Sequence, residues 1–224
     1  MDIEQEFVKL GGIFLTPPKQ INSALANIKA FVFDWDGVFN DGRKTGDIGS
    51  SYSEVDSMGI NLLRFDYWLK NNRVPMVFII SGMKNQSAAE FSRREHFEGI
   101  FLNTKNKKES LDSLCGNFKI AAKEIAFIFD DVLDIEVAKM SGLSFFIGRK
   151  SNPLLMDYIK QNQVCNYISG FTGENHAVRE ICELLIGLSG NYNRAVELRI
   201  QFKGEYEKYW NIRNAIKTEM VLLQ

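Results

Sequence analysis

The sequence predicts one α/β domain in which helices cover both faces of a mostly parallel sheet. Short apolar runs alternate with segments of helical length from residue 28 to about residue 188. The runs are continuous and rich in Val, Ile and Phe, which is typical of strands that are buried on both faces. The 224 residues, 45% of them hydrophobic, are enough for one such domain with a sizeable core.

The expected elements follow one another in strict alternation. The expected strands are residues 28–33, 74–80, 99–102, 125–129 and 143–147. The expected helices are residues 60–71, 86–96, 108–117, 133–141 and 177–188. Gly142 follows the fourth helix, at the position that glycine favours after a helix end. Such alternation favours a three-layer α/β/α arrangement around a parallel central sheet.

Three segments depart from this alternation and divide the chain. Residues 1–27 contain a Gly-Gly and a Pro-Pro pair and predict an irregular arm with a short helix near its end. Residues 38–56, with turn-forming residues at their centre, predict a β-hairpin inside a domain of residues 28–190. Residues 191–224 form a C-terminal extension, in which residues 192–222 carry apolar side chains every three or four positions and predict one long amphipathic helix, with Gly204 as a potential break.

Composition excludes several functions. The formal charge of 27 − 28 = −1 gives no general attraction to nucleic acid or anionic lipid. No apolar run approaches the roughly 20 residues that a membrane span needs, and the first residues are acidic where a signal peptide would be basic. Three cysteines without a Cys-x-x-Cys pair suggest neither a disulfide framework nor a zinc site, so a reducing, cytoplasmic location is expected.

The first expected strand ends in two carboxylates. Asp34-Trp35-Asp36 follows the run 28–33, at the strand end where open α/β sheets bind their ligands. Asp34 there can act as a nucleophile or a metal ligand, and Asp36 can carry a proton to or from the same site. By itself the pair is equally typical of a polar turn.

Three later segments favour the chemical interpretation. Ser81-Gly82 ends another strand and offers a hydroxyl and main-chain N–H groups to an anion. Lys107 opens the next helical segment and can supply a positive charge. Asp130 ends a further strand, with Asp131 and Asp134 beyond it. Hard oxygen ligands, anion donors and a cation at one sheet edge are what Mg²⁺-assisted phosphoryl transfer requires.

In this order the four segments resemble the four motifs of the haloacid dehalogenase superfamily of phosphatases, whose fold is Rossmann-like. The closer resemblance is to the capless sugar-acid phosphatases, the 3-deoxy-D-manno-octulosonate 8-phosphate phosphatase family of lipopolysaccharide biosynthesis and its nine-carbon relatives. The resemblance implies that Asp34 is the nucleophile, Asp36 the general acid/base, Ser81 the phosphoryl-binding hydroxyl and Lys107 the motif cation. It also implies that Mg²⁺ is held by Asp34, the Asp36 carbonyl and Asp130, with Asp131 and Asp134 behind them.

Two positions depart from the family pattern. Phe129 stands where the family has Gly before the Asp-Asp pair, and its ring either crowds the metal or packs elsewhere. Met83 follows the second motif, where the family carries a charged residue, which leaves the substrate less specified than the chemistry. Gly82 and Arg179 are further candidate substrate contacts, although Arg179 can equally form a surface ion pair.

Other functions have less support. A response-regulator receiver has its acidic pair first and its phospho-acceptor later, the reverse of the order here. No Gly-x-Gly-x-x-Gly follows the first strand, which disfavours dinucleotide oxidoreduction. A phosphomutase would need a cap domain. A non-catalytic oligomerisation or scaffold module, or a phosphatase of another small phosphate ester, stays open.

The spacing of the motifs also predicts an assembly. The intervals 81 − 34 = 47 and 107 − 81 = 26 residues leave no room for a cap domain. An isolated monomer would therefore leave the site open to solvent. Similar capless phosphatases form tetramers, so we expect a homotetramer with the segment 38–56 at the subunit contacts and no nucleic-acid or membrane partner. The C-terminal aromatic residues Phe202, Tyr206, Tyr209 and Trp210 either add a second contact surface or dock on their own domain.

Overall fold

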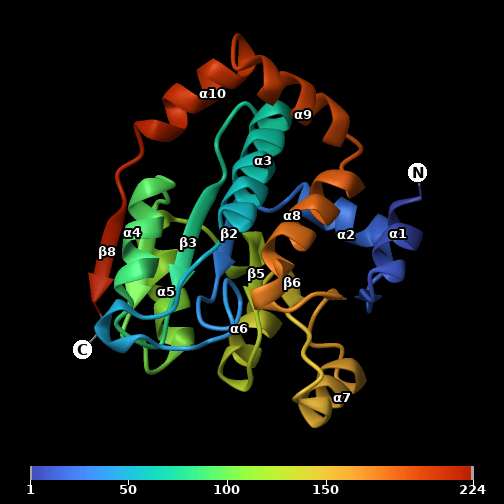
Figure 1. Cartoon of the computed structure of the whole chain (residues 1–224), viewed down its shortest axis with the longest axis vertical. Coiled ribbons are helices and arrows are strands. Elements are labelled where there is room, and N and C mark those ends of the chain that lie inside the picture. The colour runs from blue at the N-terminus through green and yellow to red at the C-terminus, as the bar shows by residue number, and fades with distance from the viewer. Residues whose placement is uncertain (1, 223–224) are drawn as a thin grey trace.

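The computed structural model describes residues 2–222 and contains one eight-stranded sheet between layers of helices (Figure 1). The strands are β1 (Ile13–Phe14), β2 (Ala30–Phe33), β3 (Met76–Ile80), β4 (Gly99–Leu102), β5 (Ile125–Phe129), β6 (Leu143–Phe146), β7 (Tyr167–Ile168) and β8 (Glu219–Leu222). Their order in the sheet is β1-β7-β6-β5-β2-β3-β4-β8. Neighbours are parallel, apart from the antiparallel pair of β1 and β7. The predicted α/β/α fold with a parallel central sheet is confirmed.

Ten α-helices lie in the described part of the chain. They are α1 (Ile3–Lys9), α2 (Pro18–Leu25), α3 (Glu54–Asn71), α4 (Gln86–Arg94), α5 (Lys107–Phe118), α6 (Ile135–Met140), α7 (Pro153–Gln161), α8 (Ala177–Leu188), α9 (Tyr192–Gln201) and α10 (Glu205–Asn214). Short 3₁₀ turns are η1 (Gly46–Ile48), η2 (Ala122–Glu124), η3 (Val132–Asp134) and η4 (Gly173–Asn175). Among the residues that the structure describes, no helix combines the length and apolarity needed to cross a membrane.

The central strands are buried on both faces, as their continuous apolar sequences predict. In β2, Phe31 and Phe33 pack with residues of α2, α3, α4 and α8 on one face. Ala30 and Val32 pack with residues of α5, α6 and α7 on the other. Because alternate side chains enter opposite cores, a strand of this kind needs an apolar residue at every position.

The helix α3 begins six residues earlier than predicted, at residue 54 rather than 60. The Ser53 hydroxyl accepts a hydrogen bond from the Val55 amide at 3.1 Å, so it caps a first turn that carries Glu54 and Asp56. Acidic residues in a first turn are favoured by the helix dipole. Apolar periodicity alone starts only at residue 60 and misses this polar turn.

The hairpin predicted for residues 38–56 is wrong. The segment forms a loop in which one antiparallel bridge, Thr45 to Gly49, flanks η1. Side chains bond the main-chain groups that a ladder would pair: Trp35 Nε1 donates to the Ser50 carbonyl at 3.2 Å, and Asn40 Nδ2 donates to the Ser51 carbonyl at 2.9 Å. Both ends of the loop are thereby fixed beside the end of β2 without cross-strand pairing.

Two regions contain elements that the sequence did not predict. Within residues 1–27, α1 precedes the predicted short helix, and β1 pairs with β7 at one edge of the sheet. The helix α7 and strand β7 lie between β6 and α8. A two-residue strand has too few positions to show periodicity, which explains why β1 and β7 escape a pattern search.

The single helix predicted for residues 192–222 is also wrong. The chain breaks into α9, α10 and the strand β8, with Phe202 (φ 53°) and Gly204 (φ 66°) in left-handed conformations at the break. β8 pairs in parallel with β4, where the Glu219 amide donates to the Glu98 carbonyl at 3.0 Å. The last apolar residues have helical spacing, but they form a strand because the edge of β4 offers main-chain groups with which they can pair. The boundaries at residues 28 and 191 stay a prediction, since both flanking segments add a strand to this sheet.

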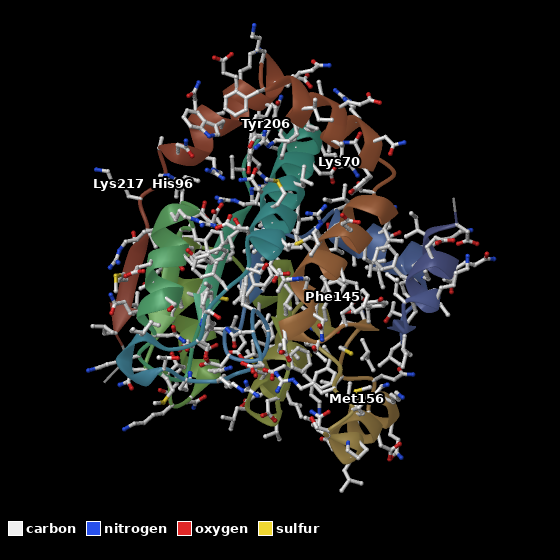
Figure 2. The ribbon with its side chains drawn as sticks, viewed as in Figure 1. Lys70, His96, Phe145, Met156, Tyr206 and Lys217 are labelled. Carbon is white, nitrogen blue, oxygen red and sulfur yellow. The ribbon has the colours of Figure 1, made fainter. Side chains whose placement is uncertain are left out.

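The helices α9 and α10 lie across the end of α3, at the top of Figure 1, whereas the C-terminal ends of the strands point downward. Tyr206 and Tyr209 are buried against Phe65 and Trp68 of α3 (Figure 2 labels Tyr206). The ring of Phe65 lies 4.9 Å from that of Tyr206 and 5.2 Å from that of Tyr209. Docking on their own domain is therefore the role of these two tyrosines.

Phe65→Ala is expected to lower the free energy of unfolding by about 3–5 kcal/mol, because it empties the centre of this aromatic cluster. Trp210→Ala is the matched control on α10: Trp210 is 38% exposed, so its loss should cost about 1 kcal/mol or less. Urea denaturation measures both values. Equal losses in the two variants would show that α9 and α10 are not packed on α3 in solution.

Candidate active site

Three neighbouring strands bring polar side chains to one edge of the sheet. Asp34 directly follows β2, Ser81 directly follows β3 and Asp130 directly follows β5. β2 lies between the other two strands and runs parallel to both. The Asp34 amide donates to the Ile128 carbonyl at 2.9 Å, so the ladder continues to the edge of the site. The sheet topology thus gathers the three predicted residues.

Lys107, the first residue of α5, links two carboxylates. Its Nζ lies 2.7 Å from Asp34 Oδ1 and 2.6 Å from Asp134 Oδ1. All three side chains are less than 10% exposed, so water screens these ion pairs little. Burial opposes the charge on Lys107, but the two carboxylates outweigh it and raise the pKa of the ammonium above its ordinary value. The lysine is therefore a fixed positive charge beside Asp34.

Asp34, Asp130 and Asp134 form a group that can hold a metal ion. One carboxylate oxygen from each lies within 4.8 Å of the others, and all three residues are buried. Asp130 Oδ1 has no hydrogen-bond partner among the described residues. Burial and the neighbouring Asp34 charge raise the pKa of Asp130 to about 8. An unpartnered buried carboxylate oxygen beside like charges is the environment that a hard divalent cation stabilises, so the residues fit Mg²⁺.

The other two carboxylates of the third acidic segment differ in environment. Asp134 is 1% exposed and bonds to Lys107, whereas Asp131 is exposed and its side chain accepts a hydrogen bond from the Val132 amide at 2.6 Å. Asp131 therefore caps η3 at the surface. Asp134 bonds to Lys107 inside the buried group, where the resemblance expects a supporting carboxylate, whereas the exposed Asp131 does not lie behind the metal group as expected.

Asp36 is held by three residues that sequence reasoning missed. Ser50 Oγ donates to its Oδ1 at 2.6 Å, Asn85 Nδ2 lies 3.4 Å from the same oxygen, and Lys44 forms an ion pair with Oδ2. Ser50 and Asn85 are each 1% exposed. Asn85 carries a weak sequence signal as the residue before a predicted helix, and indeed its Oδ1 caps α4. Nothing in the local sequence of Lys44 or Ser50 marks them.

Arg149 is a further charged residue that the sequence did not single out. It follows β6, and its Nη2 lies 2.5 Å from Asp130 Oδ2. The guanidinium lies against Gly37, whose φ of +88° favours glycine. A Cβ at Gly37 would overlap both the Arg149 guanidinium and the Asp130 carboxylate. β6 lies beside β5 and runs parallel to it, so Arg149, just beyond the end of β6, reaches the same sheet edge as Asp130.

Gly37→Ala is expected to weaken divalent-cation binding by about 10-fold or more, because the added methyl would displace the Asp130 carboxylate. Isothermal titration of the metal-free chain measures the change. Gly42→Ala is the matched control: Gly42 also has a left-handed φ (+80°), but a Cβ there finds nothing nearer than the Gly37 amide at 3.9 Å. Equal weakening of cation binding in both variants would indicate that backbone strain causes it, and would contradict the explanation by overlap with Asp130.

Ser81 and Gly82 follow β3, at the same sheet edge as Asp34. Ser81 is fully buried, and the Thr104 amide donates to its carbonyl at 3.1 Å. Gly82 is half-buried beyond it, and Met83 is 57% exposed. The position after the second motif therefore faces solvent and presents an uncharged side chain.

The structure does not bring Arg179 to the aspartates. Its guanidinium forms an ion pair with Glu183 at 2.6 Å, one helical turn along α8. Its amide donates to the buried Asp56 at 2.9 Å, and its side chain packs over Gly59. An i,i+4 partner already pairs with the charge, which favours the ion-pair role, and the substrate contact of Arg179 stays a prediction.

Phe129 does not crowd the metal group. Its side chain is fully buried in the core formed with α5, α6 and α7. It stacks on Phe127 with ring centroids 5.7 Å apart and packs on Phe146 at 5.2 Å. The ring therefore packs in this core, which is the second of the two outcomes expected for it.

Comparison with known proteins finds phosphatases among the similar sequences. No family model matches the chain. The 3-deoxy-D-manno-octulosonate 8-phosphate phosphatase of Salmonella typhi is 27% identical over 173 residues, which cover 75% of this chain and 85% of the relative. The corresponding protein of Escherichia coli K12 is 26% identical over 174 residues, with the same coverage.

Solved structures show the same fold. A probable YrbI family phosphatase from Pseudomonas syringae has a TM-score of 0.66 and 25% identity over 83% of this chain and 99% of that chain. The 3-deoxy-D-manno-octulosonate 8-phosphate phosphatase of Moraxella catarrhalis, in complex with magnesium, phosphate and KDO, has a TM-score of 0.64 and 23% identity with the same coverage. In sequence and fold the chain resembles phosphatases of the haloacid dehalogenase superfamily, in particular the 3-deoxy-D-manno-octulosonate 8-phosphate phosphatases.

Proposed function

We propose that the protein hydrolyses the phosphate monoester of a sugar acid, namely 3-deoxy-D-manno-octulosonate 8-phosphate or a related nine-carbon 2-keto-3-deoxy acid phosphate. The observation that carries this proposal is the buried group of Asp34, Lys107 and Asp130 at one sheet edge. It combines a nucleophile, a fixed cation and a free metal-ligand oxygen. The substrate class is supported by the similarity to the 3-deoxy-D-manno-octulosonate 8-phosphate phosphatases of Salmonella typhi and Escherichia coli.

In the first half of the reaction, Asp34 attacks the phosphorus in line. The new bond joins a carboxylate oxygen of Asp34 to phosphorus, and the bond from phosphorus to the sugar oxygen breaks. Asp36 gives a proton to the departing oxygen. Lys107 and the Ser81 hydroxyl offset the charge on the phosphoryl oxygens, and they need no rearrangement because both are already buried in place.

In the second half, Asp36 takes a proton from a water molecule that attacks the phosphoryl group. The bond between Asp34 and phosphorus breaks, and inorganic phosphate leaves. Ser50 and Asn85 keep the Asp36 carboxylate beside the site through both halves. The carboxylates of Asp34 and Asp130 and the main-chain carbonyl of Asp36 would hold Mg²⁺. When bound, this ion neutralises phosphoryl charge and fixes the geometry of the transfer.

A panel of phosphate esters tests the proposed function. Phosphate release with Mg²⁺ is measured from 2-keto-3-deoxy sugar-acid phosphates, hexose phosphates and nucleotides. We expect the highest kcat/KM with a sugar-acid phosphate. Turnover of nucleotides alone would contradict the substrate class. A folded, Mg²⁺-loaded chain that hydrolyses none of them would favour the non-catalytic scaffold.

We also propose that the protein is a homotetramer in which the segment 38–56 lies at the subunit contacts. Exposed apolar side chains surround this part of the catalytic edge: Ile48 is 58% exposed, Met58 38% and Met83 57%. Contact with a neighbouring subunit would cover them and would complete a site that has no cap of its own. Light scattering at micromolar concentration is expected to give four times the mass of the chain, and a fully active monomer would contradict the proposal.

A further inference from the structure

The two oxygens of the Asp130 carboxylate have different environments. Oδ2 accepts a hydrogen bond from Arg149 Nη2 at 2.5 Å. Oδ1 is buried and has no partner among the described residues, and Asp130 belongs to the compact group with Asp34 and Asp134. One oxygen is therefore fixed by a guanidinium and the other is left for a ligand.

The contact between Arg149 and Asp130 is largely buried and depends on the glycine at position 37. The Arg149 side chain is 26% exposed and that of Asp130 5% exposed, so water screens this ion pair little. Gly37 supplies the room, since any side chain there would overlap both groups. A charge-assisted bond to one oxygen also fixes the direction of the other, because the carboxylate is planar.

The charges of the site leave it attractive to a cation even with Arg149 in place. Three carboxylates, those of Asp34, Asp130 and Asp134, face two positive side chains, those of Lys107 and Arg149. When a bound cation displaces the proton of Asp130, the three carboxylates carry −3 and the two positive side chains +2, which leaves −1. Lys107 already occupies oxygens of Asp34 and Asp134. Asp130 Oδ1 is thus a buried carboxylate oxygen of this group that has no hydrogen-bond partner among the described residues.

We infer that Arg149 is a positioning residue for the divalent cation: it holds Asp130 by Oδ2 so that Oδ1 points into the site as a ligand. This inference rests on the proposed function, which requires the cation. It assigns to Arg149 an effect on metal affinity, exerted through Asp130, and no contact with the reacting atoms. Groups that orient a metal ligand from behind commonly contribute 10- to 100-fold in affinity.

Isothermal titration of the metal-free chain with Mg²⁺ tests the inference. Arg149→Ala is expected to raise the Mg²⁺ dissociation constant by about 10- to 100-fold, because the carboxylate is then free to rotate. Arg149→Lys should recover part of the loss, since an ammonium keeps the charge but not the planar fork. Lys150→Ala is the matched control: Lys150 is exposed, so its variant removes a positive charge next in sequence without touching Asp130.

The results separate the inference from the function on which it rests. Unchanged or tighter Mg²⁺ binding by Arg149→Ala would overturn the inference, and tighter binding would mean that Arg149 competes with the cation for Asp130. An equal loss in Lys150→Ala would overturn it too, since general charge would then explain the effect. Failure of the unaltered chain to bind Mg²⁺ or to release phosphate would refute the proposed function instead. Circular dichroism checks that each variant is folded. If Arg149→Ala does not fold, the Mg²⁺ titration of Arg149→Lys tests the inference in its place, and unchanged binding by that variant would overturn it.

Discussion

Asp34→Asn is expected to lower kcat by about 10⁴-fold or more while the chain stays folded and still binds substrate. The amide cannot attack phosphorus as a carboxylate does, and the loss of a nucleophile removes the covalent route altogether. The new side chain has the same shape, so the strand end and the packing of β2 are retained. Phosphate release with the best substrate of the ester panel measures the effect.

The control for this variant is Asp41→Asn. Asp41 lies on the loop after β2 and pairs with the exposed Arg43 at 3.0 Å. The substitution therefore removes a carboxylate that is close to Asp34 in the sequence but is not part of the buried group. Its kcat should stay within about twofold of the unaltered chain, as expected for a surface change. An Asp34→Asn variant that keeps most of its rate would show that the nucleophile has been wrongly assigned.

Asp130→Asn is expected to lower kcat by about 10³-fold at a fixed low Mg²⁺ concentration and to raise the Mg²⁺ concentration needed for half-maximal rate. A metal ion stabilises a phosphoryl transition state by several kcal/mol, and each 1.4 kcal/mol is a factor of ten. The neutral amide oxygen is a weaker ligand than the carboxylate and leaves Arg149 without its partner. Rates over a Mg²⁺ series measure both quantities.

The adjacent carboxylate provides the control for Asp130→Asn. Asp131 is exposed and caps η3, so Asp131→Asn should leave the Mg²⁺ dependence unchanged. A rate loss in Asp131→Asn as large as in Asp130→Asn would mean that the metal ligand is the second aspartate of the pair. A normal Mg²⁺ dependence in both variants would exclude the whole segment as the metal site.

The sequence predicts best what the local pattern decides. β4, β5 and α8 have the predicted ends, because a fully buried strand or a strongly amphipathic helix carries its period in every residue. The loop 38–56 and the strand β8 were mispredicted, because distant partners decide them. Trp35 and Asn40 fix the loop, and the free edge of β4 converts the last residues into a strand.

The same distinction applies to the site. Asp34, Ser81 and Asp130 could be predicted because each ends an apolar run, and parallel strands end at one edge. Lys107 begins a helix whose place follows from the same topology. The residues that hold the side chains in place could not be predicted: Lys44, Ser50 and Asn85 reach Asp36 across 8, 14 and 49 positions. Such contacts depend on how loops fold over the edge, which no periodicity records.

Trapping the phosphorylated enzyme tests the covalent mechanism most directly. The chain is mixed with a sugar-acid phosphate labelled in its phosphoryl group, in the presence of Mg²⁺, and quenched in acid within milliseconds, since acyl phosphates survive acid but not base or hydroxylamine. We expect a hydroxylamine-labile phosphoryl group that peptide mass spectrometry locates on Asp34, with none in Asp34→Asn. Rapid phosphate release with no labelled protein at any time, or a label on another residue, would contradict the assignment of Asp34 as the nucleophile.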